Sequence, residues 1–111
     1  MTPAQLTEAL GHGLENAARY SPAGSEIRVS VAEDAGRVFL RVEDSGPGIA
    51  PEDRERAFER FVRLPGTDGT PGTGLGLSIA KSLAEANGAA LSLGSSATGG
   101  TLFEISIARA A

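Results

Sequence analysis

The segment from Asp44 to Ile49 combines a carboxylate with two glycines, Gly46 and Gly48, directly after a run of alternating apolar residues. An ionised carboxylate only accepts hydrogen bonds, so it favours the exocyclic amine of adenine and disfavours the carbonyl of guanine. Glycines lack a Cβ atom and let a flat ring approach the main chain closely. These residues predict an adenine-selective site, although the segment alone also fits a surface turn capped by its aspartate.

A second glycine-rich segment, Gly72 to Leu77, has the composition of an anion-binding turn at the start of a helix. Backbone N–H groups and the positive end of the helix dipole hold phosphate oxygens at such places. The segment matches neither the Walker motif, because no Gly-Lys-Ser/Thr follows, nor the dinucleotide fingerprint, because no strand directly precedes it. On its own it equally fits a flexible linker.

Four polar residues, His12, Asn16, Arg19 and Tyr20, fall within an arc of roughly 100° beside the apolar stripe of a predicted helix. The amide oxygen of Asn16 suits a magnesium ion that keeps several waters and takes its other ligands from phosphates. Arg19 could neutralise phosphate charge, and Tyr20 could lie against a nucleoside. A solvated helix face is the alternative interpretation of this set.

The elements that must position these residues follow a segregated order of helix, hairpin, short helix, loop, helix and hairpin. Such an order predicts an α+β two-layer sandwich, in which helices cover one face of a largely antiparallel sheet. Periodicity and turn residues place helices at 4–20 and from about 74 to 86, a short helix with Phe58 and Phe61 after Pro51, and strands near 27–31, 37–43, 90–93 and 102–107.

The side-chain pattern of the second long helix predicts which of its residues are buried. We expect the apolar residues to point to the core and the polar ones to face water. The expected core set is Leu75, Ile79, Ala80 and Leu83, and the expected solvent set is Ser78, Lys81 and Glu85.

The bulk properties limit the class of protein. The 111 residues suffice for a single domain, and the net charge of −4 disfavours nucleic acid or an anionic membrane as the main partner. The chain has no cysteine and one histidine, which excludes disulfides and most zinc sites and is consistent with a reducing, cytoplasmic compartment. No apolar run is long enough to span a bilayer, so we expect no direct membrane contact.

With these groups in place, the whole sequence resembles the ATP-binding catalytic domain of bacterial sensor histidine kinases. That superfamily also contains gyrase, a heat-shock chaperone and mismatch-repair ATPases. The resemblance rests on four motifs in the family's order and spacing. They are the N box from His12 to Pro22, the first glycine box from Asp44 to Ile49, the phenylalanine box from Phe58 to Phe61, and the second glycine box from Gly72 to Leu77.

The resemblance implies a Bergerat-type fold with a mixed sheet, ATP and Mg²⁺ as ligands, and a lid over ATP at about 58–75. It implies that Asn16 is the metal ligand, that Asp44 reads adenine, and that Glu15 acts as a base on an incoming histidine. The full implied nucleotide-binding set is Asn16, Arg19, Tyr20, Asp44, Gly46, Gly48, Ile49, Thr73, Gly74, Leu75, Gly76 and Leu77.

The sequence departs from the family pattern in two places. His12 stands where the family most often has asparagine, and the strand and phosphoacceptor hairpin that usually precede this domain are missing. We therefore expect residues 1–111 to be one catalytic domain of a longer kinase, with a phosphoacceptor histidine domain and a response regulator as partners. An ATP hydrolase or a serine kinase of the superfamily would carry glutamate at position 12, and a non-enzymatic interaction domain is the remaining alternative.

Overall fold

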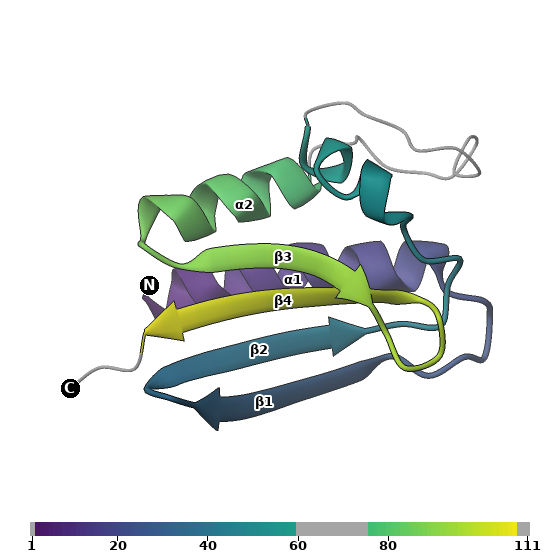
Figure 1. Cartoon of the computed structure of the whole chain (residues 1–111), viewed down its shortest axis with the longest axis horizontal. Coiled ribbons are helices and arrows are strands. Elements are labelled where there is room, and N and C mark those ends of the chain that lie inside the picture. The colour runs from purple at the N-terminus through teal and green to yellow at the C-terminus, as the bar shows by residue number, and fades with distance from the viewer. Residues whose placement is uncertain (1, 60–75, 109–111) are drawn as a thin grey trace.

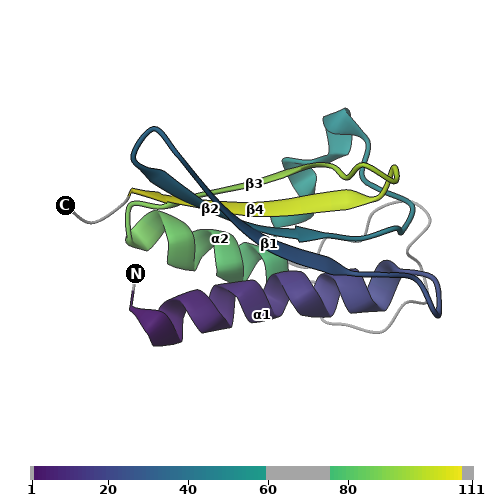
Figure 2. The ribbon, with the colours of Figure 1, turned by 90° about the horizontal axis from the view of Figure 1, so that it is seen from below.

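The computed structural model describes residues 2–59 and 76–108, which form two layers, with helices on one side of a sheet (Figure 1). Figure 2 shows both long helices lying side by side on the same face, as the sequence predicts. The elements are α1 (Pro3–Tyr20), β1 (Arg28–Asp34), β2 (Arg37–Glu43), the 3₁₀ turns η1 (Pro51–Asp53) and η2 (Arg56–Phe58), α2 (Gly76–Ala86), β3 (Ala90–Ser95) and β4 (Thr101–Ala108).

The four strands are arranged in the order β1-β2-β4-β3, and every neighbouring pair is antiparallel. Two hairpins therefore meet along β2 and β4, and no parallel pair of the implied mixed sheet occurs among the described residues. The inward rows are fixed by the register. One runs Val29, Val42, Phe103 and Leu93, and the next runs Val31, Leu40, Ile105 and Leu91.

Helix α1 begins one residue earlier than its apolar periodicity suggests because Thr2 caps it. The Thr2 hydroxyl accepts from the Gln5 amide at 3.2 Å, and the Gln5 side chain accepts from the Thr2 amide at 2.9 Å. This reciprocal pair satisfies two backbone donors that a helix start leaves unpaired. The helix ends at Tyr20, since Ser21 precedes Pro22 and takes an extended conformation.

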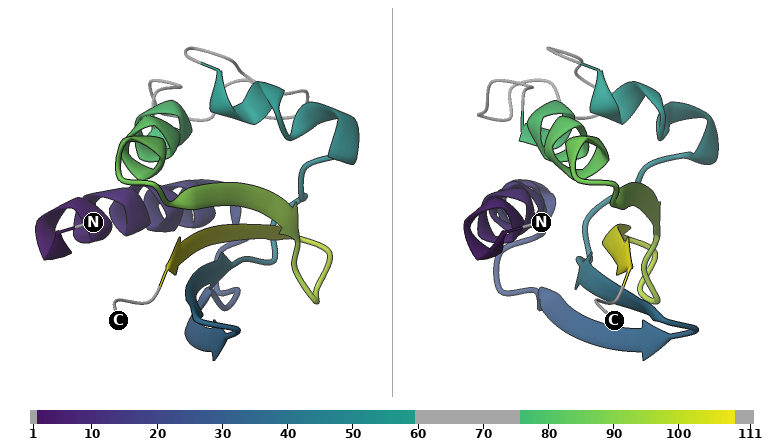
Figure 3. Two further views of the ribbon diagram at one scale, coloured as in Figure 1. Left: turned by 60° about the vertical axis from the view of Figure 1, so that its left-hand side comes forward. Right: turned by 90° about the vertical axis from the view of Figure 1, so that its left-hand side faces the viewer.

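Small residues bring the helices close to the sheet and to each other. Ala9, Gly13 and Ala17 are the buried residues of α1, and Ala80 and Ala84 are buried in α2. They pack against the large apolar residues of the inward strand rows, so the layers approach closely without long side chains between them. Figure 3 shows the resulting stack, with α1 and α2 beside one another over the same sheet face.

The burial predicted for α2 is wrong at two positions. Ile79 is 41% exposed, whereas Ser78 is buried. The buried stripe of α2 is built on Ala80 and Ala84, and Ile79, one residue away, is turned by roughly 100° from it. The prediction for Ala80 is confirmed, and Leu75 lies outside the described residues.

Strand β1 forms the edge of the sheet and keeps part of its apolar face open. Val29 and Val31 are paired with the buried Val42 and Leu40, so they lie on the helix side of the sheet. They are nevertheless 53% and 67% exposed, because neither long helix extends over β1 (Figure 3). Among the described residues, no helix combines the length and apolar composition needed to span a bilayer.

The short helix predicted after Pro51 is replaced by the two 3₁₀ turns η1 and η2. Each is three residues long, the usual length for this tighter helix. Phe58 ends η2 and packs on the core, with the Lys81 ammonium 4.5 Å from its ring centre. Phe61 lies outside the described residues.

The contact between Gly13 and Phe103 gives a test of the packing. A Cβ atom at Gly13 would lie 2.7 Å from two ring carbons of the buried Phe103, whereas nothing lies within 4 Å of one at Gly11. We expect Gly13→Ala to lower the free energy of unfolding by about 1–3 kcal/mol through overpacking. The matched variant Gly11→Ala should raise the free energy of unfolding by up to about 1 kcal/mol, because alanine has a higher helix propensity than glycine.

Urea denaturation of both variants measures the difference. Equal stability of the two alanine variants would contradict the close approach of α1 to β4.

Candidate functional site

Asp44 follows the last residue of β2 and is buried, with 4% of its surface exposed. One carboxylate oxygen, Oδ1, accepts from the Gly46 amide and from the Thr101 amide, both at 2.9 Å. The Asp44 amide in turn donates to the Thr101 carbonyl at 3.0 Å. Within the part of the chain that the structure describes, Oδ2 accepts no hydrogen bond, so one acceptor is fixed by the backbone and the other is left for a ligand.

The glycines after Asp44 sit where the main chain leaves no room for a side chain. A Cβ atom at Gly46 would lie 2.8 Å from the Tyr20 carbonyl oxygen, and one at Gly48 would lie 2.7 Å from the Gly99 carbonyl oxygen. Gly48 also has a φ of +73°, a conformation that glycine adopts readily. The segment is therefore held between the end of α1 and the β3–β4 turn.

The polar face predicted for α1 lies at the rim of the core. His12, Asn16, Arg19 and Tyr20 are all half-buried, whereas the neighbouring Glu15 is exposed. The Arg19 guanidinium carbon lies 6.0 Å from the centre of the Tyr20 ring. Because the Tyr20 carbonyl touches the Gly46 turn, this face and the Asp44 segment meet at the end of α1.

The first turn of α2 adjoins the same face of α1. A Cβ atom at Gly76 would lie 3.5 Å from Nδ1 of His12, and both ring nitrogens of His12 are buried with no hydrogen-bond partner among residues 2–59 and 76–108. Gly76 and Leu77 are half-buried. Thr73, Gly74 and Leu75, together with residues 60–75 of the predicted lid, lie outside the described residues.

These positions allow a division of chemical roles. A carboxylate oxygen open to a base, a helix face with an amide and a guanidinium, and the start of a second helix surround one end of the domain. Such a set can recognise an amine on a flat ring and neutralise phosphate charge.

The whole chain, residues 1–111, matches the model of one protein family, described as histidine kinase-, DNA gyrase B- and HSP90-like ATPase. The chain belongs to this family. It is an ATP-binding catalytic domain of the two-component sensor histidine kinases, as its individual relatives indicate.

Its relatives are sensor kinases in both sequence and structure. The sensor protein kinase CarS of Pseudomonas aeruginosa is 47% identical over 95 residues, which cover 86% of this chain and 20% of CarS. The structure of the mycobacterial sensor histidine kinase MprB gives a TM-score of 0.85 at 34% identity, covering 100% of this chain and 75% of that one. The structure of full-length ShkA in complex with AMPPNP gives a TM-score of 0.75 at 39% sequence identity, and the match covers 96% of this chain and 22% of ShkA. The chain thus spans about a fifth of the curated relatives' length.

Sequence reasoning missed the residues that hold Asp44 from the far hairpin of this kinase domain. Ser96, Thr98, Gly100 and Thr101 contact Asp44, and the turn that contains them was recognised only as a hairpin signal. Two adjacent glycines followed by threonine at the start of a strand were the available hint. That hint did not show which distant residue the turn would meet.

Arg54 fixes the segment that leaves the Asp44 turn. Its guanidinium donates to the Ile49 carbonyl at 3.4 Å and to the Ser95 hydroxyl at 3.0 Å. Ile49 itself is half-buried against the core. The arginine thereby ties the exit of the Asp44 turn to the end of β3.

The two buried ring nitrogens of His12 should lower the stability of the nucleotide-free kinase domain. A buried polar atom without a partner costs about 1–3 kcal/mol, and an apolar replacement of similar size removes that cost. We expect His12→Leu to raise the free energy of unfolding by about 1 kcal/mol. His12→Gln, which keeps polar atoms at the position, should not.

Chemical denaturation of the nucleotide-free protein gives the measurement. A less stable His12→Leu protein would mean that the ring nitrogens find partners in solution.

Proposed function

We propose that this domain binds Mg-ATP and donates the γ-phosphate to a histidine on a separate phosphoacceptor domain of the same kinase, from which a response regulator receives it. Asp44 reads the adenine, Asn16 ligates the metal, and the first turn of α2 binds phosphate. The observation on which the proposal rests is the state of Asp44, whose Oδ1 is fixed by two backbone amides while Oδ2 has no partner among the described residues.

The Asp44 geometry supports selection of adenine over guanine. A carboxylate held by backbone amides presents a fixed acceptor, which pairs with the adenine amine and repels the guanine carbonyl. The glycines beside it, Gly46 and Gly48, let the turn pack against the Tyr20 and Gly99 carbonyls, and we place the flat base against Ile49 and this turn. Tyr20, at the end of α1, is the proposed contact for the nucleoside.

The helix face of α1 supports the assignment of the phosphate end. Among the described residues, no cluster of three histidine, cysteine or acidic side chains could hold a metal by itself. A Mg²⁺ ion here would take the Asn16 amide oxygen, waters and phosphate oxygens as ligands, and would neutralise charge on the transferring group. Arg19, the amides at the start of α2 and the His12 nitrogens, which have no partner in the described part of the chain, are further polar groups that we assign to this end.

Transfer to an outside histidine fits the placement of the chain's own side chains. His12 is the only histidine, and it is half-buried between α1 and Gly76. The exposed Glu15, one residue from Asn16, is the candidate base for the N–H proton of an incoming imidazole. The domain's work is then positioning and charge neutralisation.

Asp44→Asn tests the adenine end. The substitution replaces an acceptor with a group that also presents a donor, and the lost charge-assisted hydrogen bond should weaken ATP binding about tenfold to a hundredfold. Asp34→Asn, at an exposed position at the end of β1, is the matched control and should bind ATP as the wild type does. Calorimetric titration with ATP and with GTP gives both affinities.

Equal affinity of the wild-type domain for ATP and GTP would refute the proposed role of Asp44.

Asn16→Ala tests the metal end in a phosphotransfer assay. With γ-labelled ATP and a phosphoacceptor domain of a related sensor kinase, the wild type should label the acceptor histidine, and Asn16→Ala should abolish the label. Asn87→Ala, which alters the far end of α2 where the Asn87 amide donates to the Leu83 carbonyl, should retain it. The label should be lost in acid and survive base.

Alone, the domain should neither label itself nor hydrolyse ATP quickly, since a missing general base typically lowers a rate by 10²–10⁴-fold. Acid-stable labelling of this chain or rapid phosphate release without a partner would favour the serine-kinase or the hydrolase alternative.

A further inference from the structure

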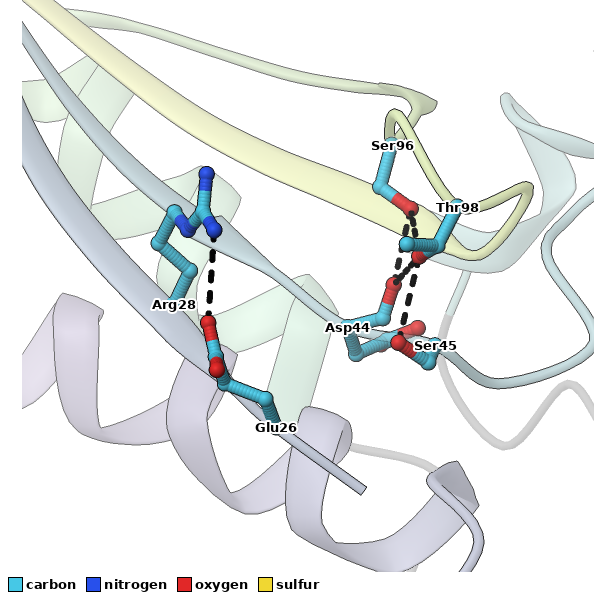
Figure 4. Close-up of polar contacts among 6 residues, drawn as sticks. All are labelled: Glu26, Arg28, Asp44, Ser45, Ser96 and Thr98. Atoms are coloured by element: carbon cyan, nitrogen blue, oxygen red, sulfur yellow. Dashed lines mark hydrogen bonds and ion pairs between the residues drawn. The ribbon is translucent and has the colours of Figure 1, made fainter.

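Ser96 makes the closest side-chain contact to the backbone of Asp44. Its hydroxyl donates to the Asp44 carbonyl oxygen at 2.7 Å (Figure 4). It also accepts from the Gly100 amide at 2.9 Å. The serine is buried, with 8% of its surface exposed. The hydroxyl therefore bridges two backbone groups that belong to segments 56 positions apart, since Gly100 minus Asp44 is 56.

Thr98 and Thr101, the neighbours of Ser96 at this end of the hairpin, also form hydrogen bonds with Asp44. Thr101 accepts from the Asp44 amide and donates its own amide to Oδ1. Thr98 donates to the Asp44 carbonyl at 3.2 Å and lies 3.1 Å from the Ser45 hydroxyl, at the more exposed side of the turn. Figure 4 shows the hydroxyls of Ser96, Thr98 and Ser45 gathered around this carbonyl.

The turn packs so closely against Asp44 that residue 100 has no room for a side chain. A Cβ atom at Gly100 would lie 2.6 Å from Oδ1 of Asp44 and still closer to the Asp44 carbonyl oxygen. If the Ser96 hydroxyl were removed, the buried Gly100 amide would lose its acceptor and the Asp44 carbonyl its better donor. Thr98 would remain on the carbonyl, but the Gly100 amide could regain an acceptor only by shifting, and Oδ1 would then lose its fixed distance from the adjacent Thr101 amide.

We propose that Ser96 is a positioning residue that sets nucleobase specificity. It fixes the Asp44 peptide so that Oδ1 stays on the Thr101 and Gly46 amides and Oδ2 stays aimed at the base. A fixed acceptor rejects a carbonyl, whereas a carboxylate free to turn away tolerates one. The inference rests on the proposed adenine reading by Asp44 and extends it to a residue that does not touch the nucleotide.

The test compares Ser96→Ala with Ser96→Thr, which keeps a hydroxyl on Cβ, and with Ser92→Ala, which alters an exposed serine on the preceding strand β3. ATP and GTP dissociation constants and the unfolding midpoint are measured for each. We expect Ser96→Ala to lower the preference for ATP over GTP by about tenfold. Ser96→Thr should largely restore the preference, and Ser92→Ala should leave it unchanged.

The ratio of the two dissociation constants separates positioning from stability, because partial unfolding weakens both nucleotides equally. A Ser96→Ala protein with a lower midpoint but an unchanged ratio would overturn the inference. If Ser96→Ala does not fold, Thr98→Ala removes the second hydroxyl from the same carbonyl and should lower the ratio a few-fold, roughly as expected for a weaker hydrogen bond. An unchanged ratio in that variant would equally refute it.

The wild-type protein separates this inference from the proposed function. A wild-type domain without preference for ATP would overturn adenine reading by Asp44, and with it the role of Ser96. A wild-type preference that survives in Ser96→Ala would overturn only the role of Ser96.

Discussion

The pairing of Asp44 with Thr101 is the interaction on which the rest of this site depends. Glu43 and Leu102 are the last register partners of β2 and β4, and Asp44 and Thr101 continue that ladder by one position. A buried carboxylate requires compensation for its lost hydration, and the two backbone amides on Oδ1 supply it. A slip of one residue between β2 and β4 would turn Asp44 to the opposite face. The strand register therefore fixes the position of the carboxylate that is proposed to read the base.

The other end of the site depends on helix packing. Buried Ala9, Gly13 and Ala17 let α1 lie close to the sheet, and the same closeness places His12 beside the first turn of α2. Gly46 connects the two ends, because its missing side chain lets the Asp44 turn touch the Tyr20 carbonyl. The separation between the groups proposed to read the base and those proposed to bind phosphate is thus set by close backbone contacts.

Local sequence patterns predict the elements well and their long-range contacts poorly. Apolar alternation and turn residues correctly placed Asp44 after a strand and recognised both hairpins. The contacts of Ser96 and Thr101 with Asp44 join residues 52 and 57 positions apart, so periodicity cannot reveal them. Burial predicted from residue type was wrong where small side chains form the packing surface. In α2 the buried stripe consists of Ala80 and Ala84, and Ile79 is exposed.

Recognition and reaction are therefore assigned to different parts of the same fold. The groups proposed to read and position the base lie directly after β2, at the start of β4 and in the turn before β4, where backbone hydrogen bonds hold them in place. The residue expected to distinguish hydrolases from kinases lies on α1, at the position of His12, next to Gly76 at the start of α2. On the proposed assignment, a change at that position alters a group beside the phosphates without disturbing the strand register that holds Asp44. The same proposal allows one adenine-binding frame to serve either water or an outside histidine as the phosphate acceptor, with the choice made by the side chains of α1 and by the domain that approaches them.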